Sequence, residues 1–194
     1  MHNYDSNSER RNLIIILAVL GVGSAFALNR IVNAVGESIP WWIDAPSVAG
    51  FYGLLFVGFD NLCWRWGMFR SLKIVSTPNI RGEWTGFLRT SHDSNEIDHK
   101  AVLTIRQTWS RISIVLETDQ SRSHSIVASI NPDAPEGCVL SYEYFNEPTA
   151  GSTRTLHTHR GSAWLKVEDG TLQGEYFTGR DRQTYGSLEF TQES

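Results

Sequence analysis

The hydrophobic pattern of this 194-residue chain changes once, near Pro78. Before this point there are two long uncharged apolar segments, Leu13–Leu28 and Ser47–Phe59. After it, apolar and polar residues alternate in short runs that Gly, Pro, Asn and Asp interrupt. Long apolar runs are typical of membrane helices, whereas alternation with a period of two is typical of strands. The sequence therefore predicts an N-terminal transmembrane α-hairpin in residues 1–77 and an all-β domain in residues 78–194.

The two apolar segments predict two membrane spans. A helix needs about 20 mostly apolar residues to cross a bilayer, so we expect helices over about 12–35 and 45–66. Trp42 precedes the second segment and Trp64 ends it, as expected of aromatic residues at a membrane interface.

Basic residues flank the spans at their outer ends. Arg10 and Arg11 precede the first segment, and Arg65, Arg70 and Lys73 follow the second. The positive-inside rule then places both termini in the cytoplasm and the short linker outside. A cleavable signal peptide is the alternative, since Ala25-Phe26-Ala27 resembles a cleavage site.

Small residues recur at a spacing of four in both spans: Gly21 with Ala25, and Ala49 with Gly53. Such spacing lets membrane helices approach closely, so we expect these positions to mediate oligomerisation. Asp60 near the end of the second span is costly in a bilayer and is either functional or at the interface.

The part after Pro78 predicts eight antiparallel strands. They fall near 81–90, 100–108, 111–118, 123–130, 138–146, 158–167, 171–178 and 185–191, and their connections are short. Because a closed barrel leaves no exposed edge, we expect an eight-stranded up-and-down barrel, lipocalin-like, with a sandwich as the alternative. Gly82-Glu83-Trp84 resembles the G-x-W of lipocalin-like barrels, whose Trp closes one end.

Charge and side-chain chemistry restrict the class of ligand that the β domain is expected to bind. Residues 78–194 hold 11 Lys and Arg against 16 Asp and Glu, so this acidic domain is not expected to attract long nucleic acid. The strands nevertheless carry tyrosines, hydroxyls and arginines, a mixture that suits nucleobases and phosphates better than fatty acids.

Enzyme chemistry finds no support in the sequence. There is no G-x-S-x-G, no P-loop and no Cys nucleophile with a paired His. His157 and His159 are expected on one strand face, but no third metal ligand stands at a convincing spacing, so neither metal nor cofactor is expected. Cys63 and Cys138 form no disulfide framework.

Several motifs together carry a resemblance to a known family. They are Ile80–Gly86, Ile105–Trp109, Ser121–Ser125, His159-Arg160-Gly161 and Gly174–Arg180. In this order they resemble the two-transmembrane β-barrel effectors of bacterial cyclic-oligonucleotide antiphage signalling (CBASS). The resemblance implies a cytosolic barrel that binds a cyclic di- or oligonucleotide made by a partner nucleotidyltransferase. It also implies self-association on binding, disruption of the inner membrane and cell death.

On this chemistry and this resemblance, we expect the ligand inside the barrel. The expected contacts are Trp109, Ser121, Ser123, Ser125, Tyr142, Tyr144, Tyr176 and Thr178, with Arg180 or Arg182 near phosphate. A membrane-anchored lipocalin-like carrier of an apolar ligand is the first alternative, and an anchored interaction domain with a filled core is the second. A polar lumen favours the nucleotide, an aliphatic lumen the carrier, and no lumen the interaction domain.

Overall fold

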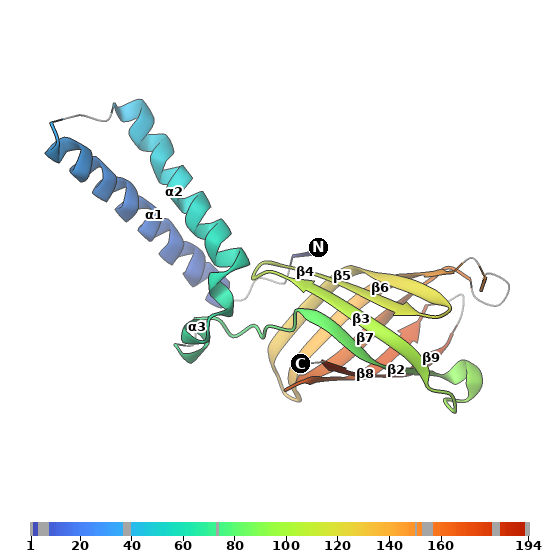
Figure 1. Cartoon of the computed structure of the whole chain (residues 1–194). Helices are drawn as coiled ribbons and strands as arrows, with labels where there is room; N and C mark the ends of the chain where they lie inside the picture. Colours follow the sequence, from blue (N-terminus) through green and yellow to red (C-terminus); the bar gives the residue numbers. More distant parts are fainter. Residues whose placement is uncertain are drawn as a thin grey trace. The chain divides into compact units, whose positions relative to one another are not determined.

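The chain divides into a helical unit, Ser6–Ser76, and a β unit formed by Met1–Asp5 and Thr77–Ser194 (Figure 1). This is a computed structural model, and it describes residues 2–3, 8–36, 40–72, 74–149, 151–152, 157–179 and 183–192.

Two long helices form the helical unit, α1 (Ser8–Ala34) and α2 (Trp41–Asn61). They pack against each other where Gly21 meets Tyr52: a Cβ on Gly21 would lie 3.1 Å from the Tyr52 backbone nitrogen. Ala25, one turn further along α1, is buried as well. In contrast, Ala49 is exposed and Gly53 has nothing within 4 Å of a Cβ. Gly21 and Ala25 therefore pack inside the hairpin, and Ala49 and Gly53 do not.

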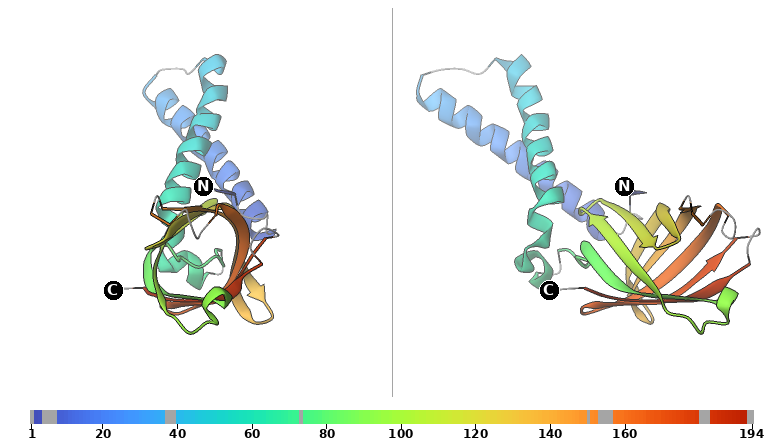
Figure 2. Two further views of the ribbon diagram at one scale, coloured as in Figure 1. Left: turned by 90° about the vertical axis from the view of Figure 1, so that its right-hand side faces the viewer. Right: turned by 45° about the vertical axis from the view of Figure 1, so that its right-hand side comes forward.

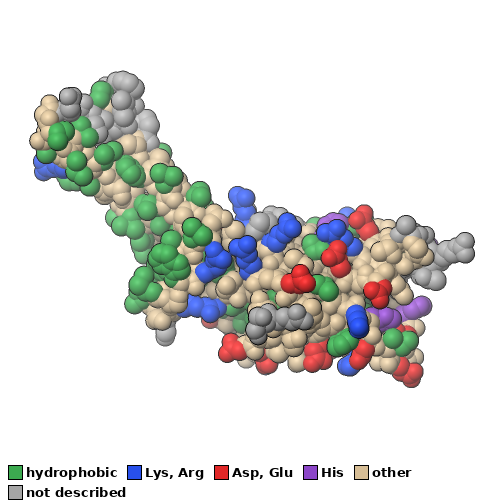
Figure 3. Space-filling model, viewed as in Figure 1, with side chains coloured by type: hydrophobic (Ala, Val, Ile, Leu, Met, Phe, Trp, Pro, Cys, Tyr) green, Lys and Arg blue, Asp and Glu red, His purple; other side chains and the backbone are tan. Residues whose placement is uncertain are grey.

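Among the described residues, one helix is long and apolar enough to cross a membrane, α1 over Arg11–Ala34. Its apolar side chains are largely exposed, as the hydrophobic surface over the helices shows in Figure 3.

A tight turn follows α2. It contains the 3-10 helix η1 (Cys63–Arg65) and the short helix α3 (Gly67–Ser71). Trp64 is only 1% exposed, and Phe59 and Phe69 meet edge to face with ring centroids 5.4 Å apart. Asp60 is buried too, at 8% exposure. The end of α2 is thus folded into a small aromatic cluster of its own.

Eight strands of the described β unit form one closed antiparallel barrel, which confirms the predicted fold. The ring is seen along its axis in Figure 2, left. The strands are β2 (Gly82–Thr90), β3 (His99–Gln107), β4 (Arg111–Thr118), β5 (Ser121–Ala134), β6 (Gly137–Pro148), β7 (His159–Glu168), β8 (Thr171–Thr178) and β9 (Tyr185–Gln192).

Each strand pairs with its neighbour in sequence, and β9 pairs with β2 to close the ring. The β4–β5 seam is short: three residue pairs run from Val115↔His124 to Glu117↔Arg122. Beyond it the two strands diverge, β5 bulges between Ser125 and Val127, and the Ser125 hydroxyl accepts a hydrogen bond from Ile114 N–H at 3.0 Å. Because these strands form a single closed sheet, the alternative prediction of a two-sheet sandwich is wrong.

One end of the barrel is sealed. Trp84, 2% exposed, donates its indole N–H to the Ile80 carbonyl at 3.0 Å. The Ile80 N–H donates to Gln107 Oε1 at 2.9 Å, and Gln107 Nε2 donates to the Pro78 carbonyl, also at 2.9 Å. Aliphatic side chains, among them Leu103, fill the lumen beside this seal. The segment before β2 therefore crosses the barrel end and is held there by side-chain hydrogen bonds.

A short strand that the sequence pattern did not predict joins the barrel. β1 (His2–Asn3) pairs antiparallel with β4, with His2 opposite Ile112 and Asn3 opposite Arg111. These positions lie on the part of β4 that its short seam with β5 leaves open. The start of the chain is thus part of the β unit, although it precedes α1 in sequence.

Candidate ligand cavity

A cavity of about 440 Å³ occupies the barrel end opposite the seal. Its walls come from the ends of the strands and from their connections. The described lining residues are Leu88, Thr90, His92, Asp93, Ile97, His99, Lys100, Leu116, Thr118, Asp119, Gln120, Ser121, Ser123, Tyr142, Tyr144, Asn146, His159, Tyr176, Thr178, Thr184 and Leu188. Its volume falls in the range of about 300–1,000 Å³ typical of small-molecule sites.

The polar wall follows from strand periodicity. On β6, Tyr142, Tyr144 and Asn146 alternate with outward residues and point into the lumen. On β8, Tyr176 and Thr178 do the same. The Tyr142 and Tyr144 rings lie 6.1 Å apart, centroid to centroid. Flat aromatic faces and hydroxyl groups therefore line one side of the cavity.

Two glycines make room for the tyrosine rings. Gly161 lies opposite Tyr144 across the β6–β7 pair, and a Cβ there would overlap the Tyr144 phenol. Gly186 lies opposite Tyr176 across the β8–β9 pair, and a Cβ there would overlap the Arg89 carbonyl and lie 2.8 Å from the Tyr176 ring. Both rings can occupy these positions only because the residue opposite each of them is glycine.

Three buried polar atoms at the cavity have no hydrogen-bond partner: the Tyr142 hydroxyl, Asn146 Nδ2 and Asp93 Oδ1. Tyr142 is 4% exposed and Asn146 is 6% exposed. Burial raises the pKa of Tyr142 well above its usual value, so its phenol stays protonated and can donate. Buried polar groups are nearly always paired, so these atoms are left to bond with a water or a ligand.

The β2–β3 connection forms part of the cavity rim, and it begins with the 3-10 helix η2 (Ser91–Asp93). Thr90 Oγ1 caps this helix by accepting from His92 N–H at 3.3 Å. The Ser91 hydroxyl accepts from Tyr185 N–H at 3.1 Å. On the outside, an Arg89 hydrogen bond and charge lower the pKa of Asp98.

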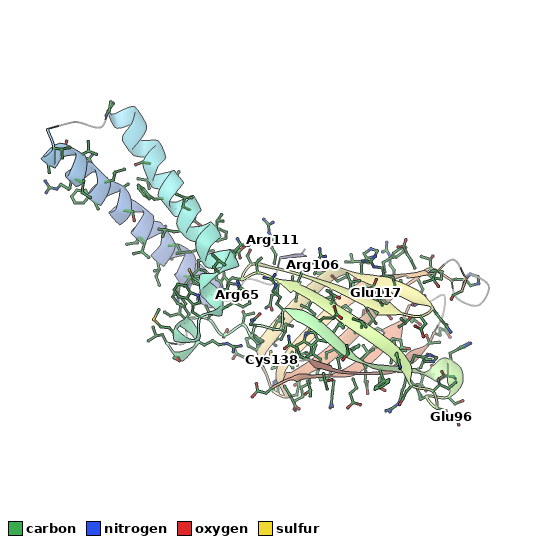
Figure 4. The ribbon with its side chains drawn as sticks, in the orientation of Figure 1. Arg65, Glu96, Arg106, Arg111, Glu117 and Cys138 are labelled. Carbon is green, nitrogen blue, oxygen red and sulfur yellow. The ribbon has the colours of Figure 1, made fainter. Side chains whose placement is uncertain are left out.

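Charges of both signs surround the cavity. The lining holds one lysine, Lys100, two carboxylates, Asp93 and Asp119, and the three histidines His92, His99 and His159. Figure 3 shows histidine and acidic side chains at this end of the barrel, and in Figure 4 Glu96 marks the β2–β3 connection while Cys138 lies toward the other end. No arginine is among the described lining residues.

The structure brings six of the ten residues expected at the ligand into the cavity lining: Ser121, Ser123, Tyr142, Tyr144, Tyr176 and Thr178. Trp109 is buried in the β3–β4 connection, and Ser125 is buried on β5; neither is part of the described lining. Arg180 and Arg182 lie outside the described residues, although Thr178 and Thr184 on either side of them line the cavity.

The expected pairing of His157 and His159 on one strand face is wrong. β7 begins at His159, and His157 lies before it, where its carbonyl contacts His159 Nδ1 at 2.8 Å. Among the described residues no group of three His, Cys, Asp or Glu is placed to hold a metal ion.

Sequence reasoning missed Asp93, His99 and Asn146. Asn146 could have been found, because it continues the alternation of Tyr142 and Tyr144. Asp93 and His99 are brought together by a turn with left-handed backbone at Ser94 and Asn95, both with φ 61°. Hydrophobic periodicity carries no signal for such a connection.

A closed barrel, sealed at one end and holding a polar, aromatic cavity at the other, defines a receptor domain for a small polar ligand. The family described as Cap15, cyclic dinucleotide receptor domain, matches residues 75–192. A protein of Yersinia aleksiciae named CD-NTase-associated protein 15 is 33% identical over 147 residues, which cover 75% of this chain and 69% of that protein. A protein of the same name in Staphylococcus schleiferi is 29% identical over 148 residues, covering 76% and 78%. The chain therefore belongs to the Cap15 family of CBASS effectors, and its barrel is a cyclic dinucleotide receptor domain.

Proposed function

We propose that the chain is an abortive-infection effector of antiphage defence. In this role the cavity binds a cyclic di- or oligonucleotide made by a partner nucleotidyltransferase, and binding leads to disruption of the inner membrane and cell death. The observation that carries the ligand part is the set of buried polar atoms without partners at the cavity. They lie in the barrel that matches a cyclic dinucleotide receptor family.

The described lining offers what a cyclic nucleotide requires. The rings of Tyr144 and Tyr176 present faces on which bases stack. The Tyr142 hydroxyl and Asn146 Nδ2, which have no partner within the described residues, can donate to sugar and phosphate oxygens, whereas the Thr178 hydroxyl is already bonded to Thr184. Lys100 supplies a positive charge for phosphate, and Arg180 or Arg182 would add a planar, bidentate partner.

An apolar ligand fits the cavity less well. A fatty acid would bury the Tyr142 hydroxyl and Asn146 Nδ2 away from water without replacing their hydrogen bonds. Each such loss costs about 1–3 kcal/mol. The lipocalin-like carrier remains an outcome that binding experiments can reveal.

The pairing of β1 with β4 supports a two-span topology. The start of the chain and the barrel belong to one folded unit, although α1 and α2 lie between them in sequence. If α1 crosses the bilayer, α2 must cross back so that both parts reach the same side. The flanking Arg and Lys residues make that side the cytoplasm, so both termini are cytoplasmic and the protein is multi-pass.

In this proposal, ligand binding leads to lateral assembly of the helical hairpins of several chains. Gly21 and Ala25 are used inside the hairpin, whereas Ala49 and Gly53 leave a small-residue face of α2 for a neighbouring chain. Asp60 at the end of α2 is buried in the single chain, so it can line a wet lesion only if assembly exposes it. Ligand binding drives this assembly only by favouring the oligomer over the monomer.

The full chain in detergent, titrated calorimetrically with cyclic di- and trinucleotides, tests the ligand. Dye-filled liposomes carrying the same protein test the output. At least one cyclic nucleotide should bind, raise the melting temperature and release the dye. Binding of fatty acids with no response to any cyclic nucleotide would establish the carrier instead. Nucleotide binding with sealed liposomes would reduce the protein to a tethered sensor.

A further inference from the structure

An acidic side chain at the cavity conflicts with the charge of the proposed ligand. Asp93 ends η2 and lines the cavity, with its side chain 16% exposed. A cyclic dinucleotide is an anion, so a carboxylate near its phosphates would be repulsive. The carboxylate must therefore face a different part of the ligand.

The two oxygens of Asp93 differ in their surroundings. Oδ2 lies 2.6 Å from His99 Nε2. Because a carboxylate can only accept, Nε2 carries the proton of this hydrogen bond. Oδ1 is buried and has no partner. The His99 contact thus fixes the carboxylate and leaves Oδ1 as an acceptor without a partner in a residue that lines the cavity.

An acceptor selects among the groups of a nucleotide. Phosphate oxygens and base carbonyls are acceptors themselves, so they cannot pair with Oδ1. The exocyclic amino groups of adenine, guanine and cytosine are donors, and carboxylates pair with such groups at base edges. Uracil and hypoxanthine have a carbonyl in place of this amino group and retain only a ring N–H as a donor on the base.

We propose that Asp93 is a specificity-determining residue whose Oδ1 accepts a hydrogen bond from the exocyclic amino group of a nucleobase. The inference rests on the proposed function, because it assumes a nucleotide in the cavity. The activating ligand then contains at least one amino-bearing base, which the wild type prefers to uracil or hypoxanthine at this position.

The rim holds Asp93 by contacts that do not involve Oδ1. Thr90, Ser91 and Asp98 each anchor the connection through other atoms. In an Asp93→Asn variant the amide oxygen can still accept from His99, and the NH₂ group then takes the place of Oδ1. This variant reverses the polarity at one atom and leaves the anchors of the rim in place.

Calorimetric titration of the full chain with cyclic di-AMP, di-GMP, di-CMP, di-IMP and di-UMP tests the proposal. The wild type should bind an amino-bearing member about tenfold or more tightly than cyclic di-IMP or di-UMP, the effect of one charge-assisted hydrogen bond. Asp93→Asn should abolish or reverse this preference. Asp119→Asn is the matched control, because it removes an exposed carboxylate from the same cavity. It should change all affinities by one common factor.

The outcomes separate the two proposals. A wild type that prefers cyclic di-UMP or di-IMP, or an Asp93→Asn variant with an unchanged preference, would overturn the role of Asp93 and leave the cyclic nucleotide receptor intact. A wild type that binds no member of the panel and no cyclic trinucleotide would overturn both.

Discussion

Tyr144 and Gly161 face each other across strands β6 and β7, and the phenol of Tyr144 fills the space that a side chain on Gly161 would need. The Phe177 carbonyl lies close to the same point, so the backbone as well as the ring would have to shift. Tyr144 can therefore line the cavity in this position only because the facing residue on the neighbouring strand is glycine.

Gly161→Ala should therefore displace Tyr144. We expect a loss of about 1–3 kcal/mol in the free energy of unfolding, the usual effect of overpacking, together with weaker ligand binding. Chemical denaturation and calorimetry measure the two effects. Gly151→Ala is the control, because nothing lies within 4 Å of a Cβ there. Equal stability of the two variants would contradict the proposed packing.

Tyr142→Phe should separate stability from binding. Removing a buried hydroxyl without a partner leaves the stability of the ligand-free protein unchanged or raises it by about 1 kcal/mol. The affinity for the cyclic nucleotide should fall by about threefold to tenfold, because one neutral hydrogen bond is lost. Thermal melting and titration give the two values, and Tyr185→Phe, at an exposed ring, is the control. A variant that is both destabilised and unchanged in affinity would assign the hydroxyl a structural role.

Loss of Arg180, Arg182 and Tyr176 together should weaken nucleotide binding by more than tenfold, since stacking and charge-assisted contacts would be lost together. The two single arginine variants identify which cation faces phosphate. Undiminished affinity in the triple variant would remove these residues from the site.

Gly53→Leu should block cell killing without weakening nucleotide binding. A side chain at Gly53 meets open space within the chain, so the hairpin itself should form normally. Gly21→Leu is the contrasting variant, because it would press on the Tyr52 backbone and reduce the amount of folded protein. Colony survival, membrane potential and protein level distinguish the two. Full killing by Gly53→Leu would place the interface between chains elsewhere.

Reporters fused before Met1 and after Ser194 should both act as cytosolic. The proposed topology expects this result, because β1 pairs with β4 in one folded unit and the positive-inside rule favours the cytoplasm for the flanking arginines. A reporter active in the periplasm at either end would overturn the topology.

Much of the barrel could be predicted because its alternation is regular. β4 and β8 begin and end at the expected residues, and Tyr142, Tyr144, Tyr176 and Thr178 line the cavity as their strand phase suggests. β5 runs to Ala134, further than expected, since its bulges accommodate Asn131-Pro132. A strand as short as His2–Asn3 has no period to detect.

The remainder of the site comes from turn geometry. Asp93 and His99 are six residues apart and meet through a connection with left-handed residues, which a hydrophobic pattern does not encode. Trp109 resembles a stacking residue in sequence but is buried in the β3–β4 connection. A list of aromatic and hydroxyl residues therefore cannot distinguish cavity walls from barrel packing.

The seal of Trp84, Ile80 and Gln107 has a consequence for signalling. It closes the lumen at the end where the chain enters the barrel, so a ligand in the cavity at the opposite end cannot reach that end through the lumen. The effect of ligand binding must therefore be transmitted along the barrel strands whose ends hold the ligand, or across the outer surface of the barrel to a neighbouring barrel. Substitutions on the outer surface of the barrel, far from the nucleotide, should then be able to abolish the response to ligand as substitutions in the cavity do.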